Sequence, residues 1–426
     1  MVTAEVKLWD ERMGAVTWIT ELNCASFQFD TQFLRKNRDV SPIHLPISDA
    51  QRVNTTFMFS GLAFDTFQGL PGLLADSLPD SFGHRLLDVW LAQKGLTPQH
   101  VNPVERLCYM GTRSMGALSF HPIKNHTFEQ SNVLALNELV EITQKIMADK
   151  AQFAIPLGQT DKEKAQALLN VLSVSTSAGG ARPKAIIAMN ASGEIRSGLI
   201  VAPEGFDYWL LKFDGVTEGE LGKPTEYGKR EYAYYLMAKD CGIEMSECRL
   251  LEENGRHHFM TTRFDRVNHE KIHMQTLCGL QHYDYRQAGA YSYEQAFATM
   301  RQLNLKAHEA EQLFRRMVFN VMAKNQDDHT KNISFLMDKK GTWHLSPAYD
   351  VTYAHNPLGQ WTNQHQMRVN GKRENISVED FSQVARSINL KHDNAIIEQI
   401  SDVIHAWPRY AKAVDLKSPH TLAPTV

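Results

Sequence analysis

The sequence predicts an α+β protein in which a strand-rich region is followed by a mainly helical one. Within residues 185–201, and again within 248–264, two short apolar runs flank a turn that contains glycine, which indicates two β-hairpins. From Ser292 onward, apolar residues recur at the spacing of helices. A loop of acidic and polar residues, 325–332, follows one of these helices. These observations favour one lobe built on strands and one built on helices.

The N-terminal elements are expected to mix strands and helices. A hairpin is predicted from residues 6–9 and 16–20. Apolar residues between 73 and 91 recur every three or four positions, which predicts one amphipathic helix. The other predicted elements are a strand at 27–29, a strand within 111–120, and helices at 132–148 and 161–172.

The C-terminal elements complete the helical lobe. The helix at 230–241 is expected to end at Gly242, because glycine adopts the left-handed conformation that terminates helices. The tail, residues 417–426, is rich in Pro, Ser and Thr and is expected to be frayed. The other predicted elements are a strand at 206–213, short strands at 333–337 and 342–345, and helices at 293–303, 307–324, 378–388 and 394–411.

Composition excludes several classes of protein. The chain has 426 residues, 43% hydrophobic and 22% charged, which is ordinary for a soluble globular protein. A net charge of -3 gives no global argument for direct binding to nucleic acid. The beginning of the chain has no apolar segment of signal-peptide length, and no apolar run could span a bilayer, so no membrane role is expected. The five scattered cysteines fit reduced thiols in the cytoplasm.

The acidic loop carries the strongest chemical signal. Asp327 and Asn332 form an Asp-x4-Asn pattern, and Asp350 arrives 18 residues later, after the short hairpin at 333–345. In protein kinases a loop of this shape carries a catalytic carboxylate and a metal-binding amide, and a second metal-binding Asp follows a hairpin. Asp327 would orient a hydroxyl nucleophile, and Asn332 and Asp350 would hold Mg²⁺. His329 and Lys331 could contact phosphates or brace the loop. The alternative is a polar surface loop with incidental acids.

A segment rich in small residues, 175–184, lies between a predicted helix and the first strand of the strand-rich region. Small residues let backbone N–H groups approach a phosphate, and Arg182 and Lys184 add positive charge. The segment matches neither standard glycine-rich fingerprint, and a flexible surface turn is the alternative. The residues expected to contact ATP here are Ser177, Ala178, Gly179, Gly180, Ala181, Arg182 and Lys184.

Lys212 lies inside an apolar strand, where an ammonium group is costly to bury without a partner. An ATP phosphate, with a helix carboxylate bracing the lysine, would supply that partner. Glu231 is the candidate carboxylate, with Glu226 as the second choice. The alternative is an edge-strand lysine that reaches water.

Arg263, Asp265 and Arg266 follow one another at the end of a predicted strand. Their alternating charges predict either a salt-bridged structural corner or a role in binding substrate or nucleotide.

Seven segments together resemble the HipA family, the serine/threonine kinase toxins of bacterial HipBA toxin–antitoxin systems. They occur in the family's order and span most of the chain. They are GLLADSLPD at 72–80, GTRSMGAL at 111–118, SAGGARPK at 177–184, WLLKF at 209–213, TRFDR at 262–266, DDHTKN at 327–332 and AYDV at 348–351.

The resemblance implies a two-lobed, protein-kinase-like fold of HipA type. It has an N-terminal α/β domain and a C-terminal all-helical domain, with ATP between them. We therefore expect an N-terminal α/β subdomain at 1–125, a strand-rich ATP-binding lobe at 150–290, a helical catalytic lobe at 291–416 and a tail at 417–426.

The resemblance also implies a function. HipA-like kinases use ATP and Mg²⁺ to phosphorylate proteins, with aminoacyl-tRNA synthetases among their targets, and so slow translation and growth. Members autophosphorylate a serine of the glycine-rich loop, which ejects the loop. Ser177 matches that serine, with Ser175 close enough to compete. A small DNA-binding antitoxin, HipB, binds such toxins, so contact with DNA would be indirect.

Two other functions are consistent with the sequence. A small-molecule phosphotransferase on a related fold would turn over ATP with a metabolite and label no protein. A non-catalytic corepressor would only help an antitoxin to bind DNA, but it would not need Asp327, Asn332 and Asp350 together.

Overall fold

The computed structural model describes residues 2–52, 55–124, 133–148, 170–172, 174, 182–216, 226–420 and 422. The chain divides into two compact units, each built from segments that are distant in sequence. Unit 1 comprises Met1–Ser41, Leu45–Gly228 and Arg249–Met274, and unit 2 comprises Pro42–His44, Lys229–Cys248 and Gln275–Val426. No helix in the described ranges is long and apolar enough to cross a membrane.

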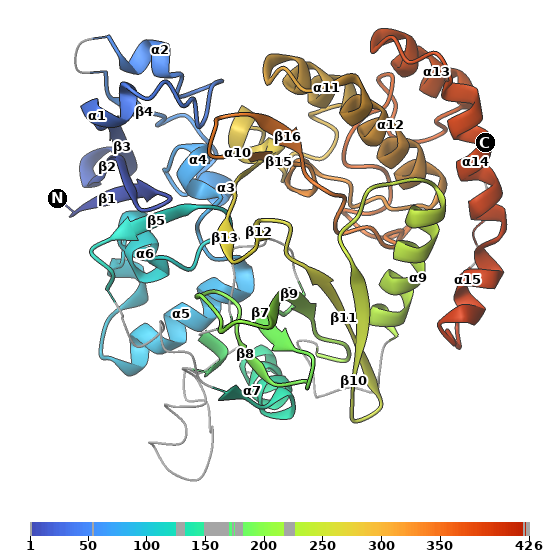
Figure 1. Cartoon of the computed structure of the whole chain (residues 1–426), viewed down its shortest axis with the longest axis horizontal. Helices are drawn as coiled ribbons and strands as arrows, with labels where there is room; N and C mark the ends of the chain where they lie inside the picture. Colours follow the sequence, from blue (N-terminus) through green and yellow to red (C-terminus); the bar gives the residue numbers. More distant parts are fainter. Residues whose placement is uncertain are drawn as a thin grey trace. The chain divides into compact units, whose positions relative to one another are not determined.

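An antiparallel five-stranded sheet begins unit 1, with strand order β4-β3-β2-β1-β5 (Figure 1). The predicted first hairpin is confirmed, although its strands are longer than expected. Trp9 and Asp10 form its turn with φ of 49° and 66°, the left-handed pair that suits a two-residue hairpin. The strands are β1 (Val2–Leu8), β2 (Glu11–Ile19), β3 (Cys24–Phe29), β4 (Phe57–Met58) and β5 (Leu118–His121).

Short helices connect and cover this sheet. Helix α6 (Pro103–Met110) packs against β1 and β5, and its N-terminus carries a capping box between Asn102 and Glu105. The other elements are η1 (Thr20–Leu22), α1 (Thr31–Leu34), α2 (Ile47–Ala50), α3 (Phe64–Phe67), α4 (Gly72–Ala75), α5 (Ser81–Gln93) and η2 (Pro98–His100).

Two of the long helices predicted from periodicity are interrupted near prolines. The helix predicted at 73–91 is wrong, because the chain leaves α4 before Pro79 and begins α5 after Asp80, whose carboxylate caps the Gly83 N–H at 2.7 Å. The helix predicted at 394–411 is also divided. It breaks at Ala406, and Pro408 lies in the first turn of the following helix.

A six-stranded sheet forms the rest of unit 1, with strand order β10-β11-β9-β7-β8-β6. Both predicted hairpins of the strand-rich region are confirmed. The helix predicted at 132–148 is wrong at its start, because Val133 and Leu134 pair with β8 before the helix begins. The strands are β6 (Val133–Leu134), β7 (Lys184–Asn190), β8 (Ile195–Ser197), β9 (Phe206–Lys212), β10 (Cys248–Glu253) and β11 (Arg256–Thr262).

The apolar face of this sheet packs on α5 and α7 (Leu136–Ala148). Trp209 and Leu211 of β9 belong to one buried cluster with Leu86 of α5 and Leu139 of α7. Burying such side chains is worth about 1.5–3 kcal/mol each, so this cluster holds the helices to the sheet.

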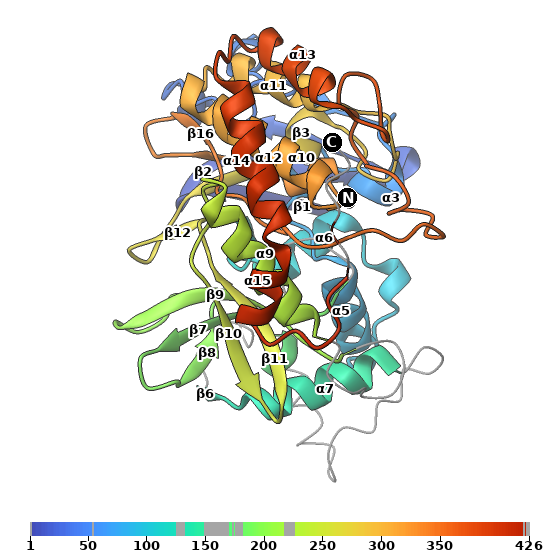
Figure 2. The ribbon, with the colours of Figure 1, turned by 90° about the vertical axis from the view of Figure 1, so that its right-hand side faces the viewer.

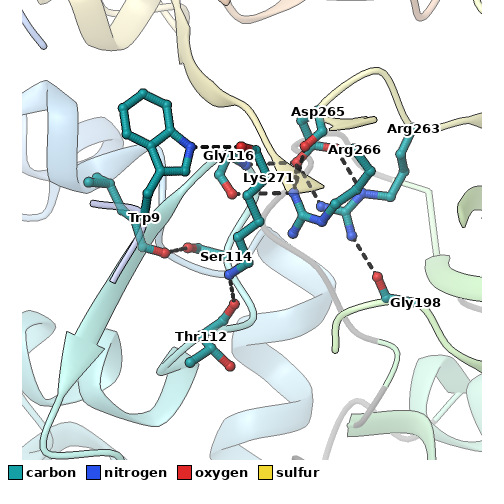
Figure 3. A network of polar contacts seen from close by, with 10 residues as sticks. Trp9, Thr112, Ser114, Gly116, Gly198, Arg263, Asp265, Arg266 and Lys271 are labelled. Atoms are coloured by element: carbon teal, nitrogen blue, oxygen red, sulfur yellow. Dashed lines mark hydrogen bonds and ion pairs between the residues drawn. The ribbon is translucent and has the colours of Figure 1, made fainter. Parts of the chain in front are cut away.

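A buried ion cluster lies at the end of β11 (Figure 3). Arg263 binds both Asp265 carboxylate oxygens, at 2.8 and 2.7 Å, and Arg266 binds one of them at 2.8 Å. The Gly116 N–H donates to the same carboxylate at 2.8 Å, and Arg263 also donates to the Gly198 carbonyl. The geometry therefore confirms the structural alternative for this motif.

The protonation of the cluster follows from its partners. Burial raises the pKa of Asp265, but the Arg263 and Arg266 guanidinium groups and the Gly116 N–H hold it well below its usual range. Gly116 has a φ of 74°, and a Cβ there would lie 3.0 Å from the Met274 nitrogen, so the position requires glycine.

The hairpin of β12 (Arg266–Val267) and β13 (Glu270–Lys271) extends this network. The Lys271 ammonium donates to the Thr112 carbonyl, and the Trp9 indole donates to the Lys271 carbonyl at 2.7 Å. Burial, together with repulsion from Arg266 and Arg263, lowers the pKa of Lys271 to about 7. The N-terminal sheet is therefore tied by polar bonds to the segment that follows β11.

Unit 2 is mainly helical and carries one small sheet of order β14-β15-β16. In both views α14 and α15 run end to end, with α9 beside α15 (Figures 1 and 2). The elements are α9 (Tyr227–Asp240), β14 (His273–Thr276), α10 (Leu277–Gln281), α11 (Tyr293–Gln302), α12 (Ala307–Met322), η4 (Thr330–Asn332), β15 (Ser334–Met337), β16 (Trp343–Leu345), α13 (Val378–Ser387), α14 (Asp393–His405) and α15 (Trp407–Ala413).

Replacing Asp265 with Asn should destabilise the protein by about 3–5 kcal/mol, because it leaves two buried guanidinium groups without their counter-charge. The measurement is the thermal unfolding midpoint of the purified variant. Glu379→Gln is the matched control, because Glu379 forms an exposed ion pair with Arg386 and its loss should leave the midpoint unchanged. Equal midpoints for Asp265→Asn and wild type would show that the ion cluster does not contribute to the stability of the fold.

Candidate functional site

The loop after α12 folds back on itself around the Asp327 carbonyl. That oxygen accepts the His329 N–H at 2.9 Å and the Asn332 side-chain amide at 2.8 Å, and the Asn332 N–H donates to the His329 carbonyl at 2.9 Å. These bonds close the turn that ends in η4. The Asp327 side chain is 49% exposed. The loop therefore exposes the Asp327 carboxylate, while hydrogen bonds within the loop hold its backbone in place.

The neighbouring acid, Asp328, points inward and is buried. Its Oδ2 accepts the Tyr293 hydroxyl and the His365 Nδ1, both at 3.0 Å, and its Oδ1 accepts the Gln366 N–H at 2.8 Å. A buried carboxylate is stable only with such partners. Asp328 therefore fixes the loop against α11 and against the segment at 365–366.

His329 and Lys331 both contact the ring of Tyr285. The Lys331 ammonium is 4.6 Å from the centre of the Tyr285 ring, a cation–π distance, and the His329 ring meets the same ring edge-on at 5.2 Å. The His329 Nε2 is 4.0 Å from an Asp327 carboxylate oxygen. The structure therefore groups Asp327 with two basic side chains on one turn.

The segment that carries Asp350 is tied to the same loop. The Tyr349 hydroxyl donates to the Lys331 carbonyl at 2.6 Å and lies 2.5 Å from the Ser334 hydroxyl. The Asn325 amide donates to the Asp350 carbonyl at 3.3 Å. Asp350 itself has a φ of 56°, a left-handed conformation that Asp tolerates better than most residues. These contacts fix where the Asp350 side chain leaves the backbone.

Asn332 and Asp350 line one small cavity within unit 2, of about 20 Å³, which is room for a water molecule. The buried Arg316 also lines it and donates to the Ser346 carbonyl at 2.6 Å. Burial lowers the pKa of Arg316 to about 10, which leaves it charged at neutral pH. The remaining lining residues are Ile243, Tyr293, Leu313, Phe319, Asn320, Asn325, Asp328, Ile333, Ala348, Tyr349 and Val351.

The donor set suits a hard cation. Asn332 gives its amide N–H₂ to the loop, so its Oδ1 is the atom suited to a metal, and Asp350 adds a carboxylate. Within the described ranges, no group of three or more His, Cys, Asp or Glu residues could hold a metal ion. Mg²⁺ does not need one, because it takes one or two carboxylates and completes its shell with water and phosphate oxygens.

The lysines predicted to contact phosphate lie on adjacent strands of unit 1. Lys212 of β9 and Lys184 of β7 are direct partners in the antiparallel register, so both side chains leave the same face of the sheet. Strand β9 lies between β7 and β11, so Lys212 is on an interior strand and the edge-strand alternative is wrong. Arg182 stacks on the Tyr227 ring at 3.9 Å.

Other predicted residues belong to different units or lie outside the described residues. Glu231 is buried on α9 and belongs to unit 2, whereas Lys212 belongs to unit 1, so the predicted brace stays a prediction. The small-residue loop lies outside the described ranges. Its predicted residues are Ser175, Ser177, Ala178, Gly179, Gly180 and Ala181.

Sequence reasoning missed the partners that hold the loop in place. Tyr293, Tyr285, His365 and Gln366 are far from residue 328 in sequence, and no spacing pattern connects them to it. The one local signal in the sequence is Asp328 itself. Two acids in a row suggest that one of them is buried and holds the loop in place.

Comparison with known proteins identifies the family. A family model described as the HipA-like C-terminal domain matches residues 176–407, and one described as the HipA N-terminal domain matches residues 4–121. The first match alone spans more than half of the chain, so the protein belongs to the HipA family.

Proteins similar to the chain include two relatives named as kinases and a solved structure. A Haemophilus influenzae protein named "Putative kinase" is 31% identical over 145 residues, 30% of this chain and 42% of that protein. A Sinorhizobium fredii protein named "Putative kinase Y4mE" is 24% identical over 176 residues, 39% of this chain and 37% of that protein. The matched part of the chain thus spans about two fifths of the length of these relatives.

The solved structure is the complex of HipA, HipB and operator DNA from the toxin–antitoxin system of Shewanella oneidensis MR-1. It matches with a TM-score of 0.64 at 16% identity and covers 98% of this chain and 92% of that chain. The predicted α+β, two-lobed, kinase-like fold of HipA type is therefore confirmed.

Replacing Asp328 with Asn should destabilise the protein by about 1–3 kcal/mol, because an amide cannot accept all three of the donors that Asp328 binds. The thermal unfolding midpoint measures the effect. Asp402→Asn, on the exposed face of α14, is the control and should leave the midpoint unchanged. An unchanged midpoint for Asp328→Asn would show that these bonds do not hold the loop.

Proposed function

We propose that this protein is an ATP- and Mg²⁺-dependent protein serine/threonine kinase and the toxin of a HipBA-type toxin–antitoxin system. One observation carries the proposal: Asn332, on the loop that presents the Asp327 carboxylate outward, lines one cavity together with Asp350. Membership of the HipA family and the names of the relatives support it.

Asp327 would accept the proton of the substrate hydroxyl as that oxygen attacks phosphorus, and it would hold the hydroxyl in line. Its exposed carboxylate suits this role, and the loop bonds behind it limit its motion. Asn332 and Asp350 would hold the metal through side-chain oxygens. Mg²⁺, when bound, offsets the negative charge on the phosphates.

Positive side chains would bind the phosphates of ATP. Lys184 and Lys212 are register partners on one face of paired strands, so their two ammonium groups would bring positive charge to the phosphates from the same side of the sheet. Arg182, His329 and Lys331 would add to this charge, and Glu231 would support Lys212. The backbone at Ser177, Ala178, Gly179, Gly180 and Ala181 would donate N–H groups to phosphate oxygens.

Regulation and partners are proposed on family membership. Phosphorylation of Ser177 would add about two negative charges beside bound ATP and would expel the loop by repulsion. A HipB-like antitoxin would bind the protein and bring it to DNA indirectly, and a translation protein such as an aminoacyl-tRNA synthetase would be the substrate. The five cysteines, all within the described residues, are buried and form no disulfide, which agrees with the reducing cytoplasm as the place of action.

Wild-type protein incubated with Mg²⁺ and labelled ATP should incorporate phosphate at Ser177 or Ser175, mapped by mass spectrometry. Asp327→Ala should lower the rate by about 10²–10⁴-fold, because the general base is lost. Glu374→Ala, an exposed acid in the same unit, should retain the wild-type rate. No label on the wild-type protein and no binding of ATP by calorimetry would reject the kinase and favour a corepressor.

Replacing Asp350 with Asn should raise the Mg²⁺ concentration needed for half-maximal phosphotransfer by at least about tenfold, because a charged oxygen ligand is lost while the side-chain shape is kept. The measurement is a Mg²⁺ titration at saturating ATP, with Asp338→Asn, in the β15–β16 turn, as the control. An unchanged Mg²⁺ requirement would remove Asp350 from the metal site.

A further inference from the structure

The C-terminal tail returns to unit 2 instead of fraying. The Trp407 indole N–H donates to the His420 carbonyl at 2.7 Å, which holds the backbone at that residue. The expected fraying is therefore wrong for the described tail as far as His420. Pro, Ser and Thr content predicted mobility, but it could not show that a distant tryptophan supplies an anchor.

The His420 side chain occupies a cage of three aromatic residues. Its ring stacks on Tyr353 with centres 3.7 Å apart and lies 4.6 Å from the Trp407 ring. Its Nε2 is 3.1 Å from the Tyr234 hydroxyl. Tyr234, Tyr353 and Trp407 come from α9, from the segment after Asp350 and from α15, so one imidazole joins three parts of unit 2.

The walls of this cage are connected to both catalytic segments. The Tyr234 hydroxyl donates to the Ala323 carbonyl at 2.7 Å, just before the Asp327 loop. Tyr353 precedes Ala354, whose N–H donates to the Lys324 carbonyl at 3.1 Å and whose carbonyl accepts the Gln326 N–H at 3.0 Å. The chain on the N-terminal side of Asp327 and the chain on the C-terminal side of Asp350 are thus paired directly beside the cage.

We propose that the C-terminal tail is a clamp on the active site, in which His420, seated between Tyr353, Trp407 and Tyr234, is a positioning residue that keeps the Asp327 loop and the Asp350 segment paired. The pairing of the two segments by His420 does not require the protein to be a kinase. Its effect on phosphotransfer depends on the proposed function.

The surroundings of the two His420 ring nitrogens favour a neutral imidazole. Because the Tyr234 hydroxyl gives its proton to the Ala323 carbonyl, it accepts from the His420 Nε2–H. The His420 Nδ1 is buried and has no hydrogen-bond partner among the described residues. A proton added there would be a buried charged donor without an acceptor, which is costly.

The charged groups that face His420 also favour its neutral form. Burial, together with the positive charges of Arg230 from α9 and Lys324 after α12, lowers the pKa of His420 to about 4. Burial raises the pKa of both Tyr234 and Tyr353, so these walls stay neutral. Since the docked pKa lies below the usual value of about 6.5, docking is fully favoured above pH 6.5 and weakens as the pH falls towards 4.

The test is amide hydrogen exchange of the full-length protein at the Gln326 and Ala354 N–H groups, which form the pairing. His420→Ala should increase their exchange about tenfold, because one aromatic stack and one hydrogen bond are lost. His420→Phe should keep most of the protection, because it retains the stack. Ser418→Ala, on the exposed tail, is the control and should match wild type.

The second measurement is the pH dependence of that protection. In wild type it should fall between pH 6.5 and 5, after correction for intrinsic exchange, whereas His420→Phe should change less because its ring cannot take up a proton. Wild-type exchange in His420→Ala, or the same pH dependence in wild type and His420→Phe, would overturn the clamp. These readouts need no kinase activity, so they remain decisive even if the protein transfers no phosphate.

Measurements of kinase activity distinguish a positioning role of His420 from a contribution to stability alone. For an active kinase, His420→Ala should lower kcat about tenfold and leave the KM for ATP within about twofold, and His420→Phe should recover most of the rate. Faster exchange in His420→Ala with an unchanged kcat would overturn the positioning role.

Discussion

The arrangement of the candidate active site depends on one buried carboxylate. Asp328 accepts hydrogen bonds from Tyr293 of α11 and from His365 and the Gln366 backbone, which are neighbours in one later segment. A charge removed from water must find such donors or it destabilises the fold. These donors hold Asp328 inward, the Asp327 side chain is half exposed on the same loop, and the Asn332 amide closes the loop on the Asp327 carbonyl.

A buried carboxylate with several donors also organises part of unit 1. The Asp265 carboxylate gathers Arg263, Arg266 and the Gly116 N–H, and the hairpin that follows brings Lys271 to the Thr112 carbonyl. Buried ion clusters add little net stability compared with apolar packing, but they tolerate only one arrangement of their members. We infer that this cluster fixes how the N-terminal sheet joins the strand-rich part of the same unit.

Local patterns predicted most of the secondary structure, and the errors have identifiable causes. Periodicity found the apolar faces of the helices at 73–91 and 394–411, but it could not weigh Pro79 and Pro408 against those faces. The start of the helix predicted at 132–148 is a strand because β8 offers hydrogen bonds to Val133 and Leu134. The hairpins were easier to predict, since turn residues and alternation lie within a few positions of each other.

The sequence by itself determined the residue types and the order of the candidate site: Asp327, Asn332 and Asp350 around a hairpin, with Lys184 and Lys212 on strands. Only the tertiary structure decided which residues support them. It placed Lys212 on an interior strand, gave Asp328 its three donors and seated His420 beside Tyr353. The reason is that spacing encodes neighbours along the chain, whereas these contacts join positions that only folding brings together.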